Sequence, residues 1–231
     1  GQVRKVNIMQ RIPILILAAV CWASQAYGQV PPSVTELANY NGLHAAAHEG
    51  DMAKINSLIS SGSDLRQTDG HGRTALHVAA FASHDKVVTA LADAGADPNR
   101  LENDKYDIIT IAAVANDADM VRTAVKAGGN AKNITSIYVG TALIAAAHLG
   151  NWESVQVLIE AGAPLDHVNN LGWTALIEAV VLGDGGPRHV KTARLLVDAG
   201  ADRSITDRNG KTPLELAQER GYTEMIGVLT P

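Results

Sequence analysis

The 231-residue sequence predicts an all-α solenoid of about six stacked helix-turn-helix units joined by polar loops. Three observations lead to this prediction. One phrase recurs along the chain, as in GRTALHVAA at Gly72–Ala80 and GWTALIEAV at Gly172–Val180. A second phrase, of the type Ala-Gly-Ala-Asp, recurs in step with it. Aromatic residues make up only 4%, so the core must be built from aliphatic side chains, which suits closely packed helices better than strands.

The period of the first phrase is close to 33 residues. Its leading position is filled in turn by Asn41, Thr74, Asp107, Thr141, Thr174 and Thr212, in steps of 33, 33, 34, 33 and 38. The second phrase keeps the same spacing and begins at Ser61, Ala94, Ala127, Ala161 and Ala199. A period in this range indicates a repeat architecture in which each unit covers its neighbour.

Each unit is expected to contain two helices. Thr74 follows a glycine, and its hydroxyl can accept hydrogen bonds from the free N–H groups of a helix start. Leu76 and the alanines after it give a first helix with a thin apolar face. Val87 and Leu91 belong to an i, i+3, i+4 pattern that predicts a second helix, and Gly95 can take the left-handed conformation that ends it. One such pair cannot bury both of its faces, so the units must stack.

These phrases closely resemble the ankyrin repeat, whose signature is Gly-x-Thr-Pro-Leu-His-x-Ala-Ala followed by Ala-Gly-Ala-Asp. The resemblance covers residues 36–230, although proline fills its usual place only at Pro213 and the third unit has KYDII at Lys105–Ile109 instead of the phrase. It implies an ankyrin repeat domain at 36–231, with β-hairpin-like finger loops between its units, and a linker at 29–35. The expected units lie near 36–68, 69–101, 102–135, 136–168, 169–206 and 207–231. Ser33 and Glu36 have the spacing of a capping box that would open the stack.

Residues 1–28 are expected to be a cleavable signal peptide. Basic residues precede an uncharged run at Ile12–Ala23, and the small residues Ala26 and Gly28 fit a cut before Gln29. The alternative is an uncleaved membrane anchor, but the run of about 12 residues is shorter than the roughly 20 that a spanning helix needs. Met9 directly precedes this segment, so we expect residues 1–8 not to be native. Export would place the protein in the periplasm or outside the cell.

The charge balance argues against a nucleic-acid partner. The chain carries a net charge of −5, and loss of residues 1–28 would remove three basic and no acidic residues, leaving −8. Binding to phosphate backbones requires clustered Lys and Arg. Cys21 is the only cysteine, so no disulfide can form within the chain. After signal cleavage we expect a protein that does not associate with membranes and is a monomer.

No catalytic motif stands out, and the sequence predicts a protein that is not an enzyme and uses no cofactor. Gly-x-Ser-x-Gly and the phosphate-binding loop are both missing. His44 and His48 have an i, i+4 spacing that can bind a metal, yet no carboxylate lies between them, and we predict no metal site. For His44 and His77 the resemblance implies a turn-stabilising hydrogen bond. The alternative, an enzyme, would draw on His48, Asp117 and His148.

The ankyrin resemblance implies that a partner protein binds the concave face, made of finger tips and the exposed sides of first helices. The positions carried over to this sequence are Arg66, His71, Arg73, Phe81, Asn103, Asp104, Tyr106, Tyr138, His148, Asn170, Leu171, Trp173 and Arg208. Four of them are aromatic and fall in the middle units, where they can form a binding stripe. The alternative is that the rings pack against the next finger. This alternative stays open for Tyr138, whereas binding is favoured for Trp173 and Tyr106.

The predicted function is an exported, non-enzymatic protein-interaction module. A secreted effector acting on host proteins would use the same surface, and the sequence does not separate the two. The fifth unit has about five extra residues within Gly183–His189. A tolerated surface loop is the favoured interpretation of this insertion, and a partner-contacting loop is the alternative.

Overall fold

The computed structural model describes residues 29–231, so the predicted signal peptide lies outside the described residues. This part of the chain forms thirteen helices and no named strand. They are α2 (Val34–Asn39), α3 (Gly42–Glu49), α4 (Met52–Ser60), α5 (Ala75–Phe81), α6 (Asp85–Asp93), α7 (Ile108–Val114), α8 (Ala118–Lys126), α9 (Ala142–His148), α10 (Trp152–Glu160), α11 (Ala175–Val181), α12 (Pro187–Asp198), α13 (Pro213–Arg220) and α14 (Thr223–Leu229).

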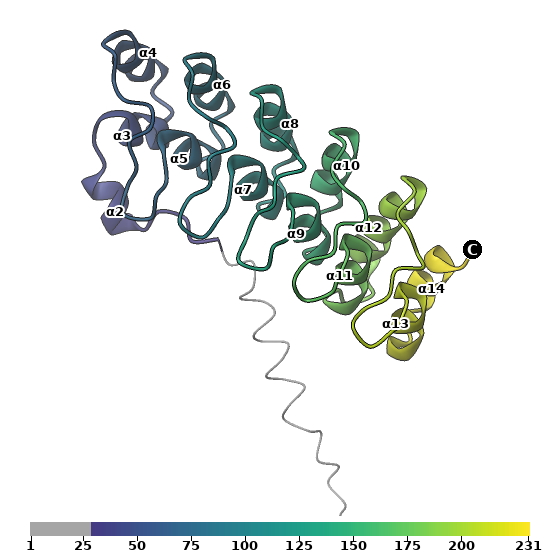
Figure 1. Ribbon diagram of the computed structural model, residues 1–231. Coiled ribbons are helices and arrows are strands. Elements are labelled where there is room, and N and C mark those ends of the chain that lie inside the picture. The colour runs from purple at the N-terminus through teal and green to yellow at the C-terminus, as the bar shows by residue number, and fades with distance from the viewer. Residues whose placement is uncertain (1–28) are drawn as a thin grey trace, which may run out of the picture.

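The helices after α2 alternate between two rows (Figure 1). One row holds the first helix of each unit, from α3 to α13, and the other holds the second helix, from α4 to α14. Each helix contacts its partner in the unit and the neighbouring helix in its own row. The predicted stack of six helical hairpins is therefore confirmed.

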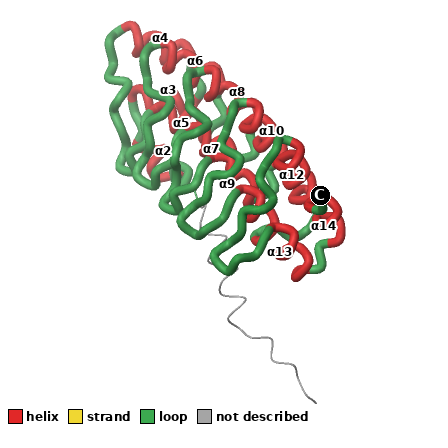
Figure 2. Tube along the Cα trace, turned by 45° about the vertical axis from the view of Figure 1, so that its right-hand side comes forward, coloured by secondary structure: helices red, strands yellow, loops and turns green. Residues whose placement is uncertain are grey.

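The loops between units project to one side of the helices (Figure 2). Only the loop between α8 and α9 contains a β-bridge among the described residues, joining Thr135 to Gly140 in antiparallel fashion. The other loops are built from turns, so the hairpin-like shape comes mostly without strand pairing.

The core lies between the two rows and consists mostly of Ala, Leu, Ile and Val, as the composition predicts. The first helices of the middle units are buried most completely. All seven residues of α9 are buried, whereas α13 at the end of the stack buries only Pro213, Leu216 and Ala217. Alanines such as Ala112 and Ala146 let neighbouring helices approach closely, because their side chains take little space.

The predicted helix starts and ends are present. The hydroxyls of Thr141, Thr174 and Thr212 accept hydrogen bonds from N–H groups in the first turn of their helices. Ser33 and Glu36 form the expected capping box. Gly95 follows α6 with a φ of +100°, a backbone conformation that residues other than glycine rarely adopt. These local signals position the helices from which the finger loops extend.

The inserted stretch of the fifth unit is part loop and part helix, because residues 183–186 form a loop and residues 187–189 form the first turn of α12. The α12 helix has 12 residues, whereas α10 has nine, and Pro187 lies in its first turn. His189 hydrogen-bonds through Nε2 to the carbonyl of His148 at 3.0 Å, in the preceding unit. On the other side, the hydroxyl of Tyr222 donates to the carbonyl of Gly183 at 3.0 Å. The inserted residues thus connect the fifth unit to both of its neighbours.

Candidate protein-interaction surface

Five loops form the candidate surface, and we call them fingers one to five. They comprise residues 64–73, 97–106, 130–140, 163–173 and 201–211. In most of them, one side chain accepts hydrogen bonds from backbone N–H groups of the same loop and so stabilises its turn without a pair of β-strands. In the first finger the Asp69 carboxylate accepts hydrogen bonds from the N–H groups of His71 and Arg73, both at 2.9 Å. Asn169 and Asp207 do the same in fingers four and five. Such Asx turns follow directly from the sequence pattern.

Hydrogen bonds between successive fingers join them into one ladder. The N–H of Asn103 donates to the carbonyl of His71 at 3.0 Å, which links fingers one and two. Ser136 donates in the same way to Lys105 at 2.9 Å, and Asn170 to Tyr138 at 2.9 Å. The Arg208 guanidinium then reaches the carbonyl of Asn170. The fingers are therefore held at fixed positions relative to one another.

Most of the predicted binding residues lie on this ladder with their side chains accessible. The exposed ones are Arg66, His71, Asn103, Asp104, Asn170 and Arg208. Phe81, Tyr138, Leu171 and Trp173 are half-buried and present part of their surface. The structure brings most of these residues onto one side of the stack, across fingers one to five and the end of α5 (Figure 2).

Three of the predicted residues are buried and offer little to a partner. Tyr106 is 5% exposed and belongs to the core, so it does not extend the expected aromatic stripe. Arg73 is 1% exposed and binds acidic groups within the protein. His148 is also buried, and its Nδ1 lies 3.1 Å from a carboxylate oxygen of Glu178.

Glu178 is a buried carboxylate that the sequence analysis did not single out. It lies on α11 and accepts a 2.7 Å hydrogen bond from the side-chain amide of Asn169, which shapes the fourth finger. Its other oxygen contacts His148 of the preceding unit. The fourth finger is thus tied to two first helices. The available signal was a glutamate within the otherwise apolar stretch TALIEAV, since a charge on such a face requires a buried partner.

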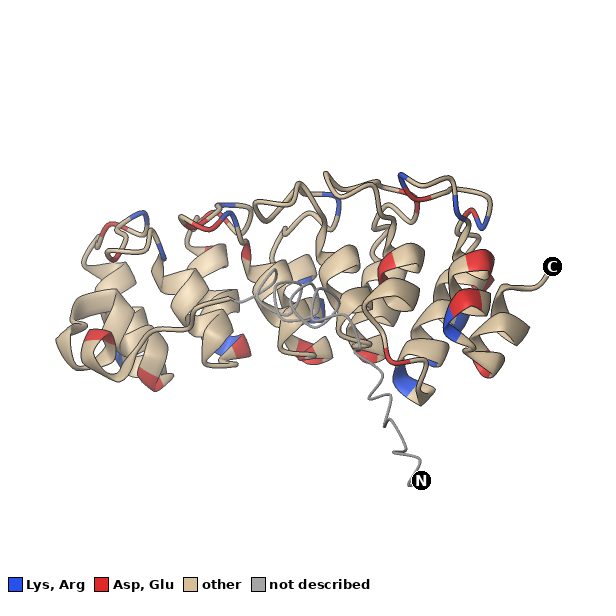
Figure 3. Ribbon diagram, turned by 90° about the horizontal axis from the view of Figure 1, so that it is seen from below, with Lys and Arg blue, Asp and Glu red and all other residues tan. Residues whose placement is uncertain are grey.

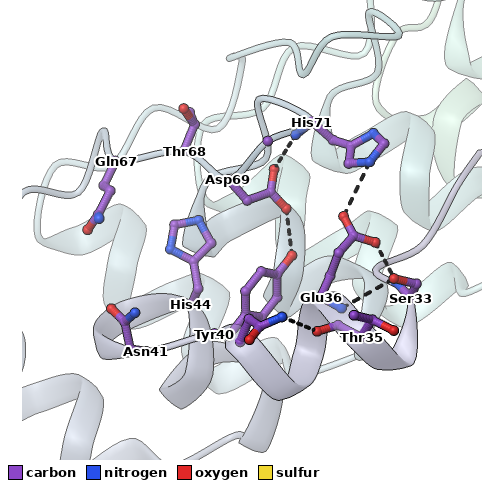
Figure 4. Close-up of a pocket in the computed structure, with 12 residues that line it drawn as sticks. Ser33, Thr35, Glu36, Tyr40, Asn41, His44, Gln67, Thr68, Asp69 and His71 are labelled. Carbon is purple, nitrogen blue, oxygen red and sulfur yellow. Dashed lines mark hydrogen bonds and ion pairs between the residues drawn. The ribbon is translucent and has the colours of Figure 1, made fainter.

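Helix α2 is attached at the start of the ladder through polar contacts, because none of its own residues is buried. The Arg73 guanidinium binds the carboxylates of Asp69 and Glu36. The Tyr40 hydroxyl donates to Asp69 at 2.6 Å (Figure 4). Burial would raise the pKa of Asp69, but the hydrogen bonds from Tyr40 and Arg73 outweigh it and hold that pKa below its usual value.

A cavity of about 640 Å³ lies between α2 and the first finger. Tyr40, Asp69, Glu36 and His71 line it, and Figure 4 shows the first two paired with each other and the last two likewise. These polar groups are paired with one another and attach α2 to the stack. The cavity therefore does not present a set of free polar groups that converge on one point, as a ligand site would.

Two residues of the alternative enzymatic site make structural contacts. Asp117 caps α8 by accepting from the N–H of Met120 at 3.0 Å, and His148 contacts Glu178. Within residues 29–231, no group of three His, Cys, Asp or Glu side chains is placed to hold a metal ion. His44 and His77 make structural hydrogen bonds to the carbonyls of Arg73 and Arg100, which is the role that their positions predict. No helix in the same range is long and apolar enough to cross a bilayer.

Comparison with known proteins identifies ankyrin repeats in this chain and a similar bacterial protein. A family model described as ankyrin repeats (3 copies) matches residues 19–102 and 109–207. The chain is 34% identical to the ankyrin repeat protein YahD of Escherichia coli (strain K12) over 185 residues, covering 80% of this chain and 92% of that protein.

Two solved structures are also similar. An ankyrin repeat domain from Acinetobacter baumannii AYE is 39% identical, with a TM-score of 0.76, over 81% of this chain and 95% of that one. A chain from the complex of the predatory endopeptidase Bd0816 of Bdellovibrio bacteriovorus with the immunity protein Bd3460 is 25% identical. Its TM-score is 0.68, over 82% of this chain and 97% of that one.

Proposed function

The chain belongs to the ankyrin repeat family, and from this premise we propose that it is an exported, non-enzymatic module that binds a partner protein through its fingers and first helices. Proteins of this family are interaction modules, and their activity is the recognition of other proteins. The proposed export rests on the composition of residues 1–28, and the proposed surface rests on the ladder of fingers.

The hydrogen-bonded ladder is the observation that carries the proposal. Because each finger donates to the backbone of the one before it, side chains from different units keep their relative positions without a partner. A surface that is already ordered loses little conformational entropy on binding, and this favours affinity. Asn103 and Asp104 on the second finger and Asn170 and Leu171 on the fourth contribute polar and apolar groups to this surface.

The nature of the partner is supported by charge and by similarity. An acidic chain is poorly suited to nucleic acid, and an extended row of loops suits the surface of a protein. A similar chain occurs in a complex between an endopeptidase and an immunity protein, and this supports a proteinaceous partner.

The proposal is tested by affinity capture from the source bacterium with the wild type and two tryptophan variants. Trp173→Ala removes a half-buried ring from the fourth finger and should weaken the retained interaction about tenfold, as expected for an interface hot spot. Trp152→Ala is the control, because Trp152 lies on the row of second helices, away from the fingers, where the ammonium group of Lys191 lies over its ring. The proposal fails if neither the wild type nor Trp152→Ala retains a protein, or if Trp173→Ala retains it equally well.

Export is tested separately by mass spectrometry of the native protein. Cleavage before Gln29 should yield a product that begins at that residue and is found outside the cytoplasm. A product that retains residues 12–28 in the membrane fraction would instead support the anchor.

A further inference from the structure

Exposed aliphatic side chains form a cluster on two adjacent fingers, whereas Val30, Val34, Leu101 and Leu149 are exposed elsewhere in the described residues. Among the described residues, Ile134, Ile137 and Val139 on the third finger are 46%, 60% and 45% exposed, and Val168 on the fourth is 44% exposed. The two fingers are in direct contact, because His167 hydrogen-bonds through Nε2 to the carbonyl of Val139 at 2.7 Å. Isolated exposed aliphatic residues need no explanation, but a cluster of them on one projecting loop does.

Val139 also has an unfavourable backbone conformation. Its φ is +56°, in the left-handed region, where a β-branched side chain is strongly disfavoured. Gly72, Gly172 and Gly210 fill the same place in fingers one, four and five, with positive φ values of 76°, 86° and 75°. Lys105 fills it in the second finger. The third finger therefore has valine at the position where most fingers of this protein have glycine, and the extra side chain is exposed.

The surrounding hydrogen bonds hold this conformation in place. Thr135 and Gly140 exchange two backbone hydrogen bonds, of 2.9 and 3.0 Å, below the tip. The N–H of Val139 donates to the carbonyl of Ser136 at 3.2 Å, and the side chain of Asn170 donates to the carbonyl of Ile137 at 3.2 Å. Strain that is maintained in this way, at an exposed position, is typical of a site prepared for binding.

The charges around the tip indicate what kind of surface it fits. The five fingers contain eight acidic and eight basic residues, and the rest of the described chain contains sixteen acidic and eight basic. Figure 3 shows both signs along the row of fingers. The third finger has Lys132 as its only charged residue. The second finger beside it has five charged residues, and the fourth finger on the other side is polar, with Asp166 as its only charged residue. An uncharged apolar tip between two polar fingers matches the apolar core and polar rim of a protein interface. It lacks the basic excess that attracts anionic lipids.

Building on the proposed function, we infer that Ile137 and Val139 form an aliphatic anchor that inserts into an uncharged apolar pocket on the partner protein. Val168 of the fourth finger lies beside the anchor in the ladder and would contact the rim of that pocket.

The test separates binding from stability with a matched pair of glycine variants. Val139→Gly removes an aliphatic side chain and relieves the backbone, so it should weaken binding to the captured partner about tenfold while the melting temperature stays equal or rises. Lys105→Gly relieves the same position of the second finger without loss of an aliphatic group, and its affinity should stay within about twofold of the wild type. Ile137→Ser should weaken binding about as much as Val139→Gly.

A photo-crosslinking benzoylphenylalanine placed at position 137 of the full chain, in the source bacterium, locates the contact. Adducts should map to apolar residues that line a pocket of the partner. Adducts to lipid, to a second copy of this chain or to a charged surface would overturn the anchor. So would unchanged affinity of Val139→Gly and Ile137→Ser. If Trp173→Ala alone loses the partner, the anchor is wrong and the proposed function stands. If the wild type captures no protein, both are wrong.

Discussion

His77 connects two units through its ring. Its Nδ1 accepts a hydrogen bond from the N–H of Thr74 at 3.1 Å at the start of α5, and its Nε2 donates to the carbonyl of Arg100 at 2.9 Å. The ring is fully buried, and this burial lowers the pKa of His77 from 6.5 to about 4. The folded protein therefore favours the neutral imidazole.

This shift predicts that stability falls as pH decreases between 6.5 and about 4. In that range the unfolded chain binds a proton at His77 and the folded chain does not, so acid favours unfolding. The contribution lost across the whole range is about 3 kcal/mol, and it is fully present above pH 6.5. Urea unfolding at several pH values measures the slope.

The matched variant for this prediction is His77→Ile, because Ile144 and Ile177 fill the equivalent position in the fourth and fifth units. It should cost about 1–3 kcal/mol at pH 7 through the lost hydrogen bonds, and its stability should vary less with pH than that of the wild type. Equal pH slopes for the two proteins would contradict the assignment to His77.

At the level of elements, α12 connects three units through one buried asparagine. Arg188 donates from Nη2 to the side-chain oxygen of Asn151 at 2.8 Å, and from Nε to the carbonyl of Gly150 at 3.2 Å. Asn151 in turn donates to the carbonyls of Ala113 and Val114 at 3.0 and 2.9 Å, at the end of α7. The insertion therefore supplies an additional contact between units.

Arg188→Ala should destabilise the protein by about 1 kcal/mol, because the buried oxygen of Asn151 loses its partner. Arg194→Ala provides the control, since Arg194 is exposed on the same helix, and it should change stability by less than about 0.5 kcal/mol. Urea unfolding of both variants measures the difference. Equal stabilities would show that the insertion does not reinforce the stack.

The helices could be predicted from sequence because their signals are local. A threonine before Ala-Leu and a glycine after the second helix define each unit without knowledge of its neighbours. Burial on the fingers was harder to predict. Tyr106 looked accessible between turn residues, yet stacking covers it, and Arg73 binds α2, which lies 37 residues earlier at Glu36. Such contacts depend on how units are placed against each other, and a repeat pattern does not encode that for each side chain.

For the whole molecule, stability should decrease from the centre of the stack towards both ends. Each unit of a solenoid contacts only its neighbours, so terminal units have half the support of central ones. The six buried residues of α7 and the seven of α9 contrast with the three of α13 and with none in α2.

Hydrogen exchange should therefore be slowest for the backbone amides of α7 and α9 and fastest for α2, α13 and α14. Mass spectrometry of peptides after exchange in heavy water at neutral pH gives the protection of each helix. Equal protection along the chain would instead indicate that the whole stack opens in one step.

The separation of charge between the fingers and the rest of the described chain affects how copies of this protein meet. Outside the fingers, acidic residues exceed basic ones by eight, so two molecules that approach along their helical sides repel each other. At physiological salt the repulsion acts over about 8 Å, enough to oppose close contact. In a crowded solution the molecules would keep their helical sides apart. Their fingers, whose acidic and basic residues balance, would stay available for a different protein.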